Sequence, residues 1–128
     1  MTSVDIFSLA RHGHLAHLKQ LLEHGVDPNS KDKNGNTILI IAAQNGNKAM
    51  VKLALSHGAL INMTNMCGNS SLHFAIEFQY HKVSSYLIRK GANQEITNIR
   101  GYRAKEGIRA RRNPLDIKEK EEDILKQL

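Results

Sequence analysis

The sequence predicts an all-α solenoid of stacked helix-turn-helix units. Gly25, Gly58 and Gly91 recur at one interval of 33 residues. A second block follows the same offset, because residues 35–43 align with residues 68–76. Apolar residues near both blocks are spaced three and four apart, as in a helix that is buried along one stripe. A unit repeated at this period cannot bury its apolar face alone, so the copies must stack.

Each copy is expected to contain two antiparallel helices. The helical spacing is clearest at Leu15, Leu18, Leu21 and Leu22, and again at Val51, Leu53, Ala54 and Leu55. The recurring glycines fall just beyond these helices, where a left-handed backbone is least costly without a Cβ. Small residues at Ala42, Ala43 and Ala75 allow neighbouring helices to approach closely, and larger side chains there would overpack the core.

These residues resemble the ankyrin repeat, whose pattern runs from an Asp-x-x-Gly-x-Thr turn through paired alanines to a closing Leu-Leu-x-x-Gly-Ala. The second copy matches at Asp32, Gly35, Thr37, Leu39, Ala42, Ala43, Gly46 and Leu55, and the third at Gly68, Ser70, Leu72, His73 and Ala75. The resemblance implies an ankyrin-repeat solenoid with β-turn or hairpin fingers. It implies one domain over 1–128, with repeats at about 2–31, 32–64 and 65–97 and a degenerate capping repeat at 98–128.

The chain departs from the family pattern at several positions. Asn65 and Asn98 replace the turn aspartate that is kept as Asp32. Asparagine still closes such a turn and tolerates left-handed geometry, so we expect the fold to survive. Gly107 falls inside the predicted first helix of the fourth repeat, where glycine costs about 1 kcal/mol relative to alanine. Fraying is therefore expected at that end.

The last segment is expected to form a terminal helix. Asn113 can serve as its N-cap, with Pro114 at the first helical position. One apolar stripe follows, at Ile117, Ile124, Leu125 and Leu128, and the other faces are charged. Such a helix either caps the solenoid or continues into a longer chain.

Composition sets broad limits on class and location. A chain of 128 residues with 41% hydrophobic content suits one globular domain. No apolar run could span a membrane, and the first ten residues lack the pattern of a secretory signal. Cys67 is the single cysteine, so no internal disulfide can form. We expect a cytoplasmic protein, with the nucleus as the alternative, and a monomer.

Catalytic chemistry is not indicated. Seven histidines suggest metal binding or acid–base work, but the repeat accounts for most of them. The resemblance places His14 at the family's Gly-His position and makes His73 the turn-stabilising histidine near Ser70. No CxxC, HExxH or phosphate-binding glycine loop is present. The sequence therefore predicts no catalytic, metal-binding or cofactor-binding residue, and no enzyme.

Positive charge is the stronger signal. The net charge is +6, and many cations cluster late in the chain, at Arg100, Arg103, Lys105, Arg109, Arg111 and Arg112. Such a cluster suits an acidic protein, phosphate or anionic lipid, or simply a solvated cap. Residues 109–112 also suit a nuclear-localisation patch. Nucleic acid is disfavoured because Tyr102 is the only aromatic residue there and the chain has no tryptophan.

The resemblance also implies a binding surface, because ankyrin stacks bind proteins through a concave face of turn tips and first-helix surfaces. The matching positions are Arg11, His12, Lys31, Lys33, Asn34, Asn36, Gln44, Asn45, Thr64, Met66, Cys67, Asn69, Glu77, Phe78, Ile99, Arg100, Tyr102 and Arg111. Phe78, Met66 and Tyr102 form the predicted apolar centre of this surface. Alternatively, Phe78 packs against the inter-helix turn, where Gln79 replaces the usual glycine.

Three functional classes remain. The first is an adaptor or regulatory module that binds a protein, possibly acidic, through this face. The second is a stand-alone inhibitor of an enzyme or a filament end. The third and least favoured is a basic scaffold for nucleic acid or anionic membrane, which steep salt dependence would reveal.

Overall fold

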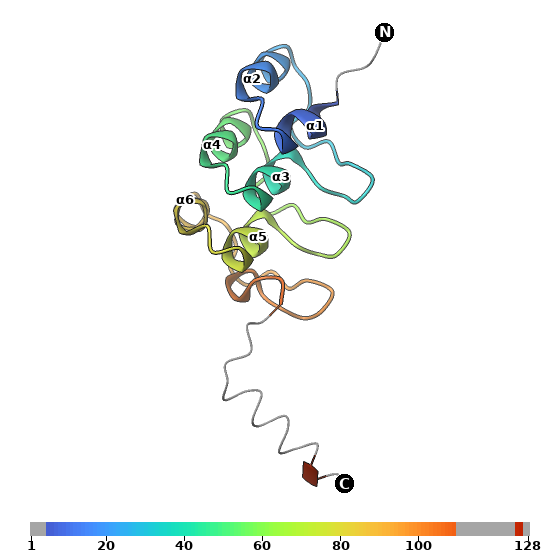
Figure 1. Ribbon diagram of the computed structural model, residues 1–128, viewed down its shortest axis with the longest axis vertical. Helices are drawn as coiled ribbons and strands as arrows, with labels where there is room; N and C mark the ends of the chain where they lie inside the picture. Colours follow the sequence, from blue (N-terminus) through green and yellow to red (C-terminus); the bar gives the residue numbers. More distant parts are fainter. Residues whose placement is uncertain (1–4, 110–124, 127–128) are drawn as a thin grey trace.

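In the computed structural model, which describes residues 5–109 and 125–126, helices stack in two layers. The first helices of the successive pairs form an inner layer, and the second helices form an outer layer (Figure 1). Between residues 5 and 109 the elements are α1 (Ile6–Arg11), α2 (Leu15–Glu23), α3 (Ile38–Gln44), α4 (Lys48–Ser56), α5 (Ser71–Glu77), α6 (His81–Arg89) and the 3₁₀ turn η1 (Ala104–Glu106). The predicted all-α solenoid is confirmed. None of the helices in the described part is long and apolar enough to cross a membrane.

The core is deepest at the central inner helix, α3. This helix packs between α1 and α5 and against α4, so apolar side chains are needed on nearly every side of it. Every residue from 38 to 43 is accordingly buried. Ala42, Ala43 and Ala75 have no exposed surface, which agrees with their predicted role at close helix contacts. The stack is therefore centred on the second repeat.

Three extended loops project from the inner side as fingers (Figure 1). Each is closed by the side chain at its start. Asp32 Oδ1 accepts the backbone N–H groups of Asn34 and Asn36, at 2.9 and 2.8 Å. Asn65 Oδ1 accepts two equivalent N–H groups in the second finger, and Asn98 Oδ1 does so in the third. The prediction that asparagine closes the turn in place of aspartate is confirmed.

The amide nitrogens of the same asparagines join one finger to the next. Asn65 Nδ2 donates to Asn36 Oδ1 at 3.0 Å, and Asn98 Nδ2 donates to Asn69 Oδ1 at 2.9 Å. Backbone hydrogen bonds also join the tip of each finger to the tip of the next one. Asn36, Asn69 and Asn98 are buried. The fingers are therefore held in a fixed register along the stack.

A sharp turn connects each inner helix to its outer helix. Gly46 occupies this turn with φ of 65°, and Gln79 adopts φ of 60° at the equivalent place one repeat later. Gly46 meets a second constraint, since a Cβ there would lie 2.7 Å from the ring of Tyr80. The turn geometry thus persists without glycine in the third repeat, whereas Gly46 is also required by packing.

The fourth repeat differs from the expectation. Its predicted first helix is only the 3₁₀ turn η1, and Gly107 follows this turn with φ of 90°. Gly107 is therefore a terminating residue rather than a helix-interior one, and a Cβ there would lie 3.1 Å from Glu77 Oε2. The predicted terminal helix from Asn113 onward lies outside the described residues, apart from Leu125 and Lys126. The predicted fraying stays a prediction.

His73 links α5 to the third finger. Its Nδ1 accepts the backbone N–H of Ser70 at 3.0 Å, as the family resemblance implied. Its Nε2 donates to the carbonyl oxygen of Tyr102 at 3.0 Å. These two bonds require the neutral ring. Burial lowers the pKa of His73, and the bond to Tyr102 opposes that shift less strongly.

This shift predicts a loss of stability in acid. The unfolded chain protonates His73 near pH 6.5, whereas the folded ring stays neutral to lower pH. The stabilisation from His73 is therefore complete above about pH 6.5 and declines as the pH falls toward the folded pKa. We expect the melting temperature to fall between about pH 7.5 and about pH 5, and to fall less in His73→Gln. The exposed His17→Gln is the control, and an equal pH dependence in both variants would contradict this account.

The packing of Tyr80 predicts unequal effects of alanine at two similar glycines. Gly13 has φ of 71° and open space around it, with Asn47 Nδ2 at 3.7 Å. Gly13→Ala should lower the free energy of unfolding by about 1–2 kcal/mol, which is the cost of placing a residue with a Cβ in the left-handed backbone region. Gly46→Ala should cost at least about 1 kcal/mol more, because the Tyr80 ring must move. Urea denaturation measures the free energy of unfolding of both variants. Equal losses would contradict this prediction, because they would show that the Tyr80 ring moves aside without cost.

Candidate functional site

The fingers and the exposed ends of the inner helices form one continuous side of the stack (Figure 1), here called the inner surface. Most predicted site residues lie on it with exposed side chains. The exposed ones are Arg11, His12, Lys31, Lys33, Asn34, Asn45, Met66, Phe78 and Arg100, and the half-buried ones are Gln44, Glu77 and Tyr102. Arg111 lies outside the described residues.

Two predicted site residues are almost completely buried. Asn36 is 9% exposed and Asn69 is 5% exposed. The Oδ1 atom of each accepts one of the inter-finger hydrogen bonds described above. We therefore assign these two amide oxygens to holding the fingers together, and the binding role predicted for Asn36 and Asn69 stays a prediction. The repeat pattern located them in the turn but did not reveal that the next finger covers them.

The finger tips carry large apolar side chains that the fold does not bury. Met66 is 72% exposed, and Ile99, one repeat later, is 74% exposed. The backbone N–H of Met66 donates to the Asn34 carbonyl oxygen, and that of Ile99 to the Cys67 carbonyl oxygen, both at 3.0 Å. The tips are thus fixed side by side. Met66 and Ile99 thus form an exposed apolar strip with fixed spacing, and exposed apolar surface of this kind often marks a binding site.

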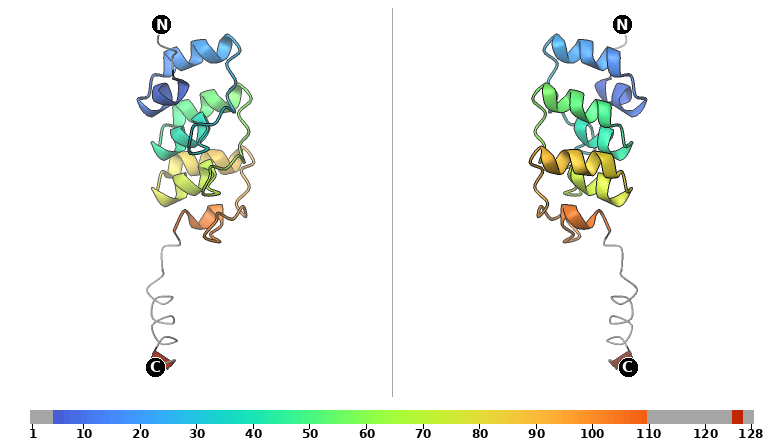
Figure 2. Two further views of the ribbon diagram at one scale, coloured as in Figure 1. Left: turned by 90° about the vertical axis from the view of Figure 1, so that its right-hand side faces the viewer. Right: turned by 90° about the vertical axis from the view of Figure 1, so that its left-hand side faces the viewer.

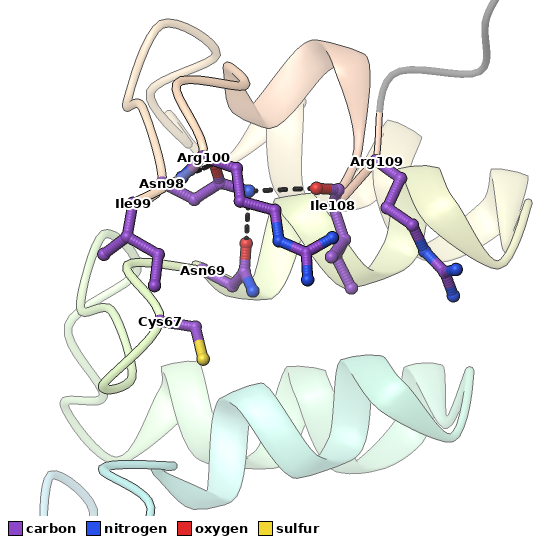
Figure 3. A pocket seen from close by; sticks show the side chains of 7 residues that line it. All are labelled: Cys67, Asn69, Asn98, Ile99, Arg100, Ile108 and Arg109. Atoms are coloured by element: carbon purple, nitrogen blue, oxygen red, sulfur yellow. Dashed lines mark hydrogen bonds between the residues drawn. The ribbon is translucent and has the colours of Figure 1, made fainter.

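A hollow of about 400 Å³ opens between the second and third fingers (Figure 3). Its lining consists of Cys67, Asn69, Asn98, Ile99, Arg100, Ile108 and Arg109. Asn98 Nδ2 donates both to Asn69 and to the carbonyl oxygen of Ile108, at 3.1 Å for the latter, and so holds the two walls together. Two guanidinium groups border an otherwise small and partly apolar space. Such a hollow suits a side chain that bears a carboxylate.

Ion pairs occupy some of the predicted site residues and leave others unpaired. Arg11 Nη2 lies 3.0 Å from Asp32 Oδ2, and Glu77 Oε1 lies 3.8 Å from Arg109 Nε. These pairs connect successive repeats. Lys33 and Arg100 form no ion pair within residues 5–109. On the inner surface, the finger tips therefore carry positive charge that no carboxylate of residues 5–109 neutralises.

Phe78 is partly packed and partly exposed. It is 49% exposed at the end of α5. Its ring centroid lies 6.3 Å from that of Phe74 and 6.1 Å from that of Tyr80, within aromatic contact. Phe78 thus covers the inter-helix turn while it presents one side to solvent. Met66 lies at a finger tip instead, so the predicted apolar centre is divided between helix end and tips.

Ile108 was not among the predicted site residues. Ile108 follows the degenerate turn η1, where the 33-residue pattern is weakest, and its position became clear only from the bond between its carbonyl and Asn98. Among the described residues, no three His, Cys, Asp or Glu side chains are grouped so that they could hold a metal ion.

A family model described as ankyrin repeats, in three copies, matches residues 6–98. The match therefore covers all three helix pairs and the first two fingers. No curated protein matches the chain.

The half-exposed position of Phe78 predicts a moderate stability loss. Phe78→Ala should lower the free energy of unfolding by about 1–2 kcal/mol, because only part of the ring is removed from water. Phe74, in α5, is only 8% exposed. Phe74→Ala should therefore lower the free energy of unfolding by about 3–5 kcal/mol, as expected when a buried aromatic side chain is removed. Chemical denaturation compares the two. A loss at Phe78 as large as that at Phe74 would identify Phe78 as a core residue and remove it from the binding surface.

Proposed function

The chain belongs to the ankyrin-repeat family, and on that premise we propose that it is a non-catalytic module that binds a protein partner through its inner surface. Ankyrin repeats are generally protein–protein interaction modules and generally non-catalytic. An adaptor or regulatory role follows if binding brings the partner to another protein or changes its state. We further propose that the protein acts as a monomer in the cytoplasm.

The observation that carries this proposal is the exposed apolar strip at the finger tips. The stack buries only a small part of Met66 and Ile99, and such exposed apolar surface lowers solubility. Lys33 and Arg100 flank them with charge. An apolar centre with a polar rim is the usual anatomy of a protein interface. The inner helix ends, with the exposed side of Phe78, extend the same surface.

The charge distribution supports an acidic partner. Lys33 and Arg100 have no carboxylate partner in the described part of the chain, and the hollow beside Arg100 also contains Arg109. Complementary charge speeds encounter and selects against positively charged partners. Phosphate-rich ligands are less well matched, because the strip between these cations is aliphatic and offers no ring on which bases stack.

The experiment is affinity capture from a matched lysate with mass spectrometry. Lys33→Glu with Arg100→Glu reverses charge at two finger tips, and a triple variant adds Phe78→Ser. The control, Lys52→Glu with Arg89→Glu, makes the same change in net charge on the outer helices. Circular dichroism confirms that each variant is folded. We expect a set of proteins to be lost with the tip variants and retained by the control.

Identical protein lists from the wild type and the tip variants would contradict the proposal. Binding would then depend on the outer helices or on the basic segment after residue 109. If captured proteins are lost from both double variants alike, net charge rather than the inner surface governs binding. A partner that is an enzyme, and is inhibited by the wild type only, would assign the inhibitor role in place of an adaptor.

A further inference from the structure

Four cations surround one aromatic ring on the outer side of the stack. The charged groups of Lys48 and Lys52, on α4, and of Arg89 and Lys90, at the end of α6, lie 5.4 to 5.8 Å from the centroid of the Tyr86 ring. The outer helices lie side by side, roughly parallel, on an open face of the molecule (Figure 2). We call these four residues and Tyr86 the outer basic cluster.

The cluster lacks neutralising carboxylates. Between Asp32 and Glu95 the sequence holds one acidic residue, Glu77, which lies at the end of an inner helix and pairs with Arg109. None of the four cations forms an ion pair with a carboxylate anywhere in residues 5–109. On the neighbouring outer helix, the carboxylate of Glu23 pairs with Lys19 at 4.0 Å. Positive charge therefore accumulates on α4 and α6 without a counterion from the chain.

Stability alone does not account for this arrangement. Cation–π contacts with Tyr86 contribute about 0.5–1 kcal/mol each at exposed sites, and the C-terminal end of α6 favours Arg89 and Lys90. Lys48, however, lies at the first position of α4, where the helix dipole disfavours a cation. Mutual repulsion adds to that cost. Features that reduce stability are often retained for binding.

A shallow groove of about 470 Å³ adjoins the cluster. Leu15, Ala49, Leu53 and the Tyr86 ring provide its apolar lining, while Lys19 and Lys52 lie at the same groove. The groove spans α2, α4 and α6, so it depends on the stacking of three repeats. Apolar lining next to unneutralised charge matches a ligand that has both properties.

We propose that the outer helices form a second docking surface, for an acidic polypeptide segment whose apolar side chain enters the groove while its carboxylates pair with the outer basic cluster. The surface lies on the opposite layer from the inner surface, so the protein can hold two partners at once. This inference does not rest on the binding proposed for the inner surface.

A polypeptide fits better than the other anionic ligands. A single-stranded nucleic acid gains affinity from stacking on aromatic rings, and the single ring here is surrounded by cations. The flat surface of an anionic membrane would leave the groove lined by Leu15 and Leu53 unfilled, whereas an apolar side chain of a polypeptide can enter it. Leu15 is 37% exposed, which leaves enough surface for one apolar side chain to contact.

The test uses fluorescein-labelled peptides in an anisotropy titration at about 0.15 M salt, near physiological ionic strength. The probe is four repeats of Glu-Glu-Leu-Ser. One control peptide replaces Glu by Gln, and another replaces Leu by Ser. We expect the probe to bind most tightly, and Lys52→Glu with Arg89→Glu to weaken it at least about tenfold. Lys33→Glu with Arg100→Glu changes net charge equally but alters the inner surface, so it should weaken probe binding by less than about threefold.

Several outcomes would overturn the inference. If the probe does not bind, or if both double variants lose the same amount of affinity for it, the cluster contributes only to the overall positive charge and is not a docking site. Equal affinity for the peptide without leucine would remove the groove from the site. Tighter binding of a thymidine oligonucleotide or of phosphatidylserine vesicles, lost with the outer variant, would assign the face to those ligands. The affinity-capture experiment on the finger tips is a separate measurement. Its result can be positive or negative with any of these outcomes, so the two proposals can fail independently.

Discussion

The architecture of the inner surface depends on two amide pairs, the half-buried pair of Asn65 with Asn36 and the buried pair of Asn98 with Asn69. In each pair, the donating asparagine uses its oxygen to close its own finger and its nitrogen to bind the preceding one. An aspartate could close the turn but has no N–H to donate. Because an unpaired buried amide costs about 1–3 kcal/mol, each pair strongly favours one spacing between fingers.

This spacing explains how a small domain presents an ordered surface on loops. Loop side chains are usually mobile, but here the backbone that carries Met66 and Ile99 is tied to the preceding tip. The outer layer reaches order differently, because α4 and α6 are fixed by packing against the inner helices. The two faces therefore have independent supports, and substitutions on one need not disturb the other.

The overall fold could be predicted because its signals are local and repeated. The glycine interval, the turn-closing asparagines and the His73 contact with Ser70 each recur in sequence or match a family position. Properties that arise between repeats could not be predicted. Asn69 is buried by a finger that begins 29 residues later, at Asn98, and the cations around Tyr86 come from helices whose facing sides are defined only after stacking. Gly107 was misassigned because the repeat pattern is faint there.

The central position of α3 has a consequence for cooperativity. Its residues 38–43 are covered by neighbours on both sides, whereas the terminal repeats have a neighbour on one side only. In a stack with nearest-neighbour coupling, the ends open before the middle does. A partner that spans all three fingers binds only molecules in which both ends are closed, so its apparent affinity scales with that closed fraction. Residues far from the contact can thus tune affinity by changing how often an end repeat opens.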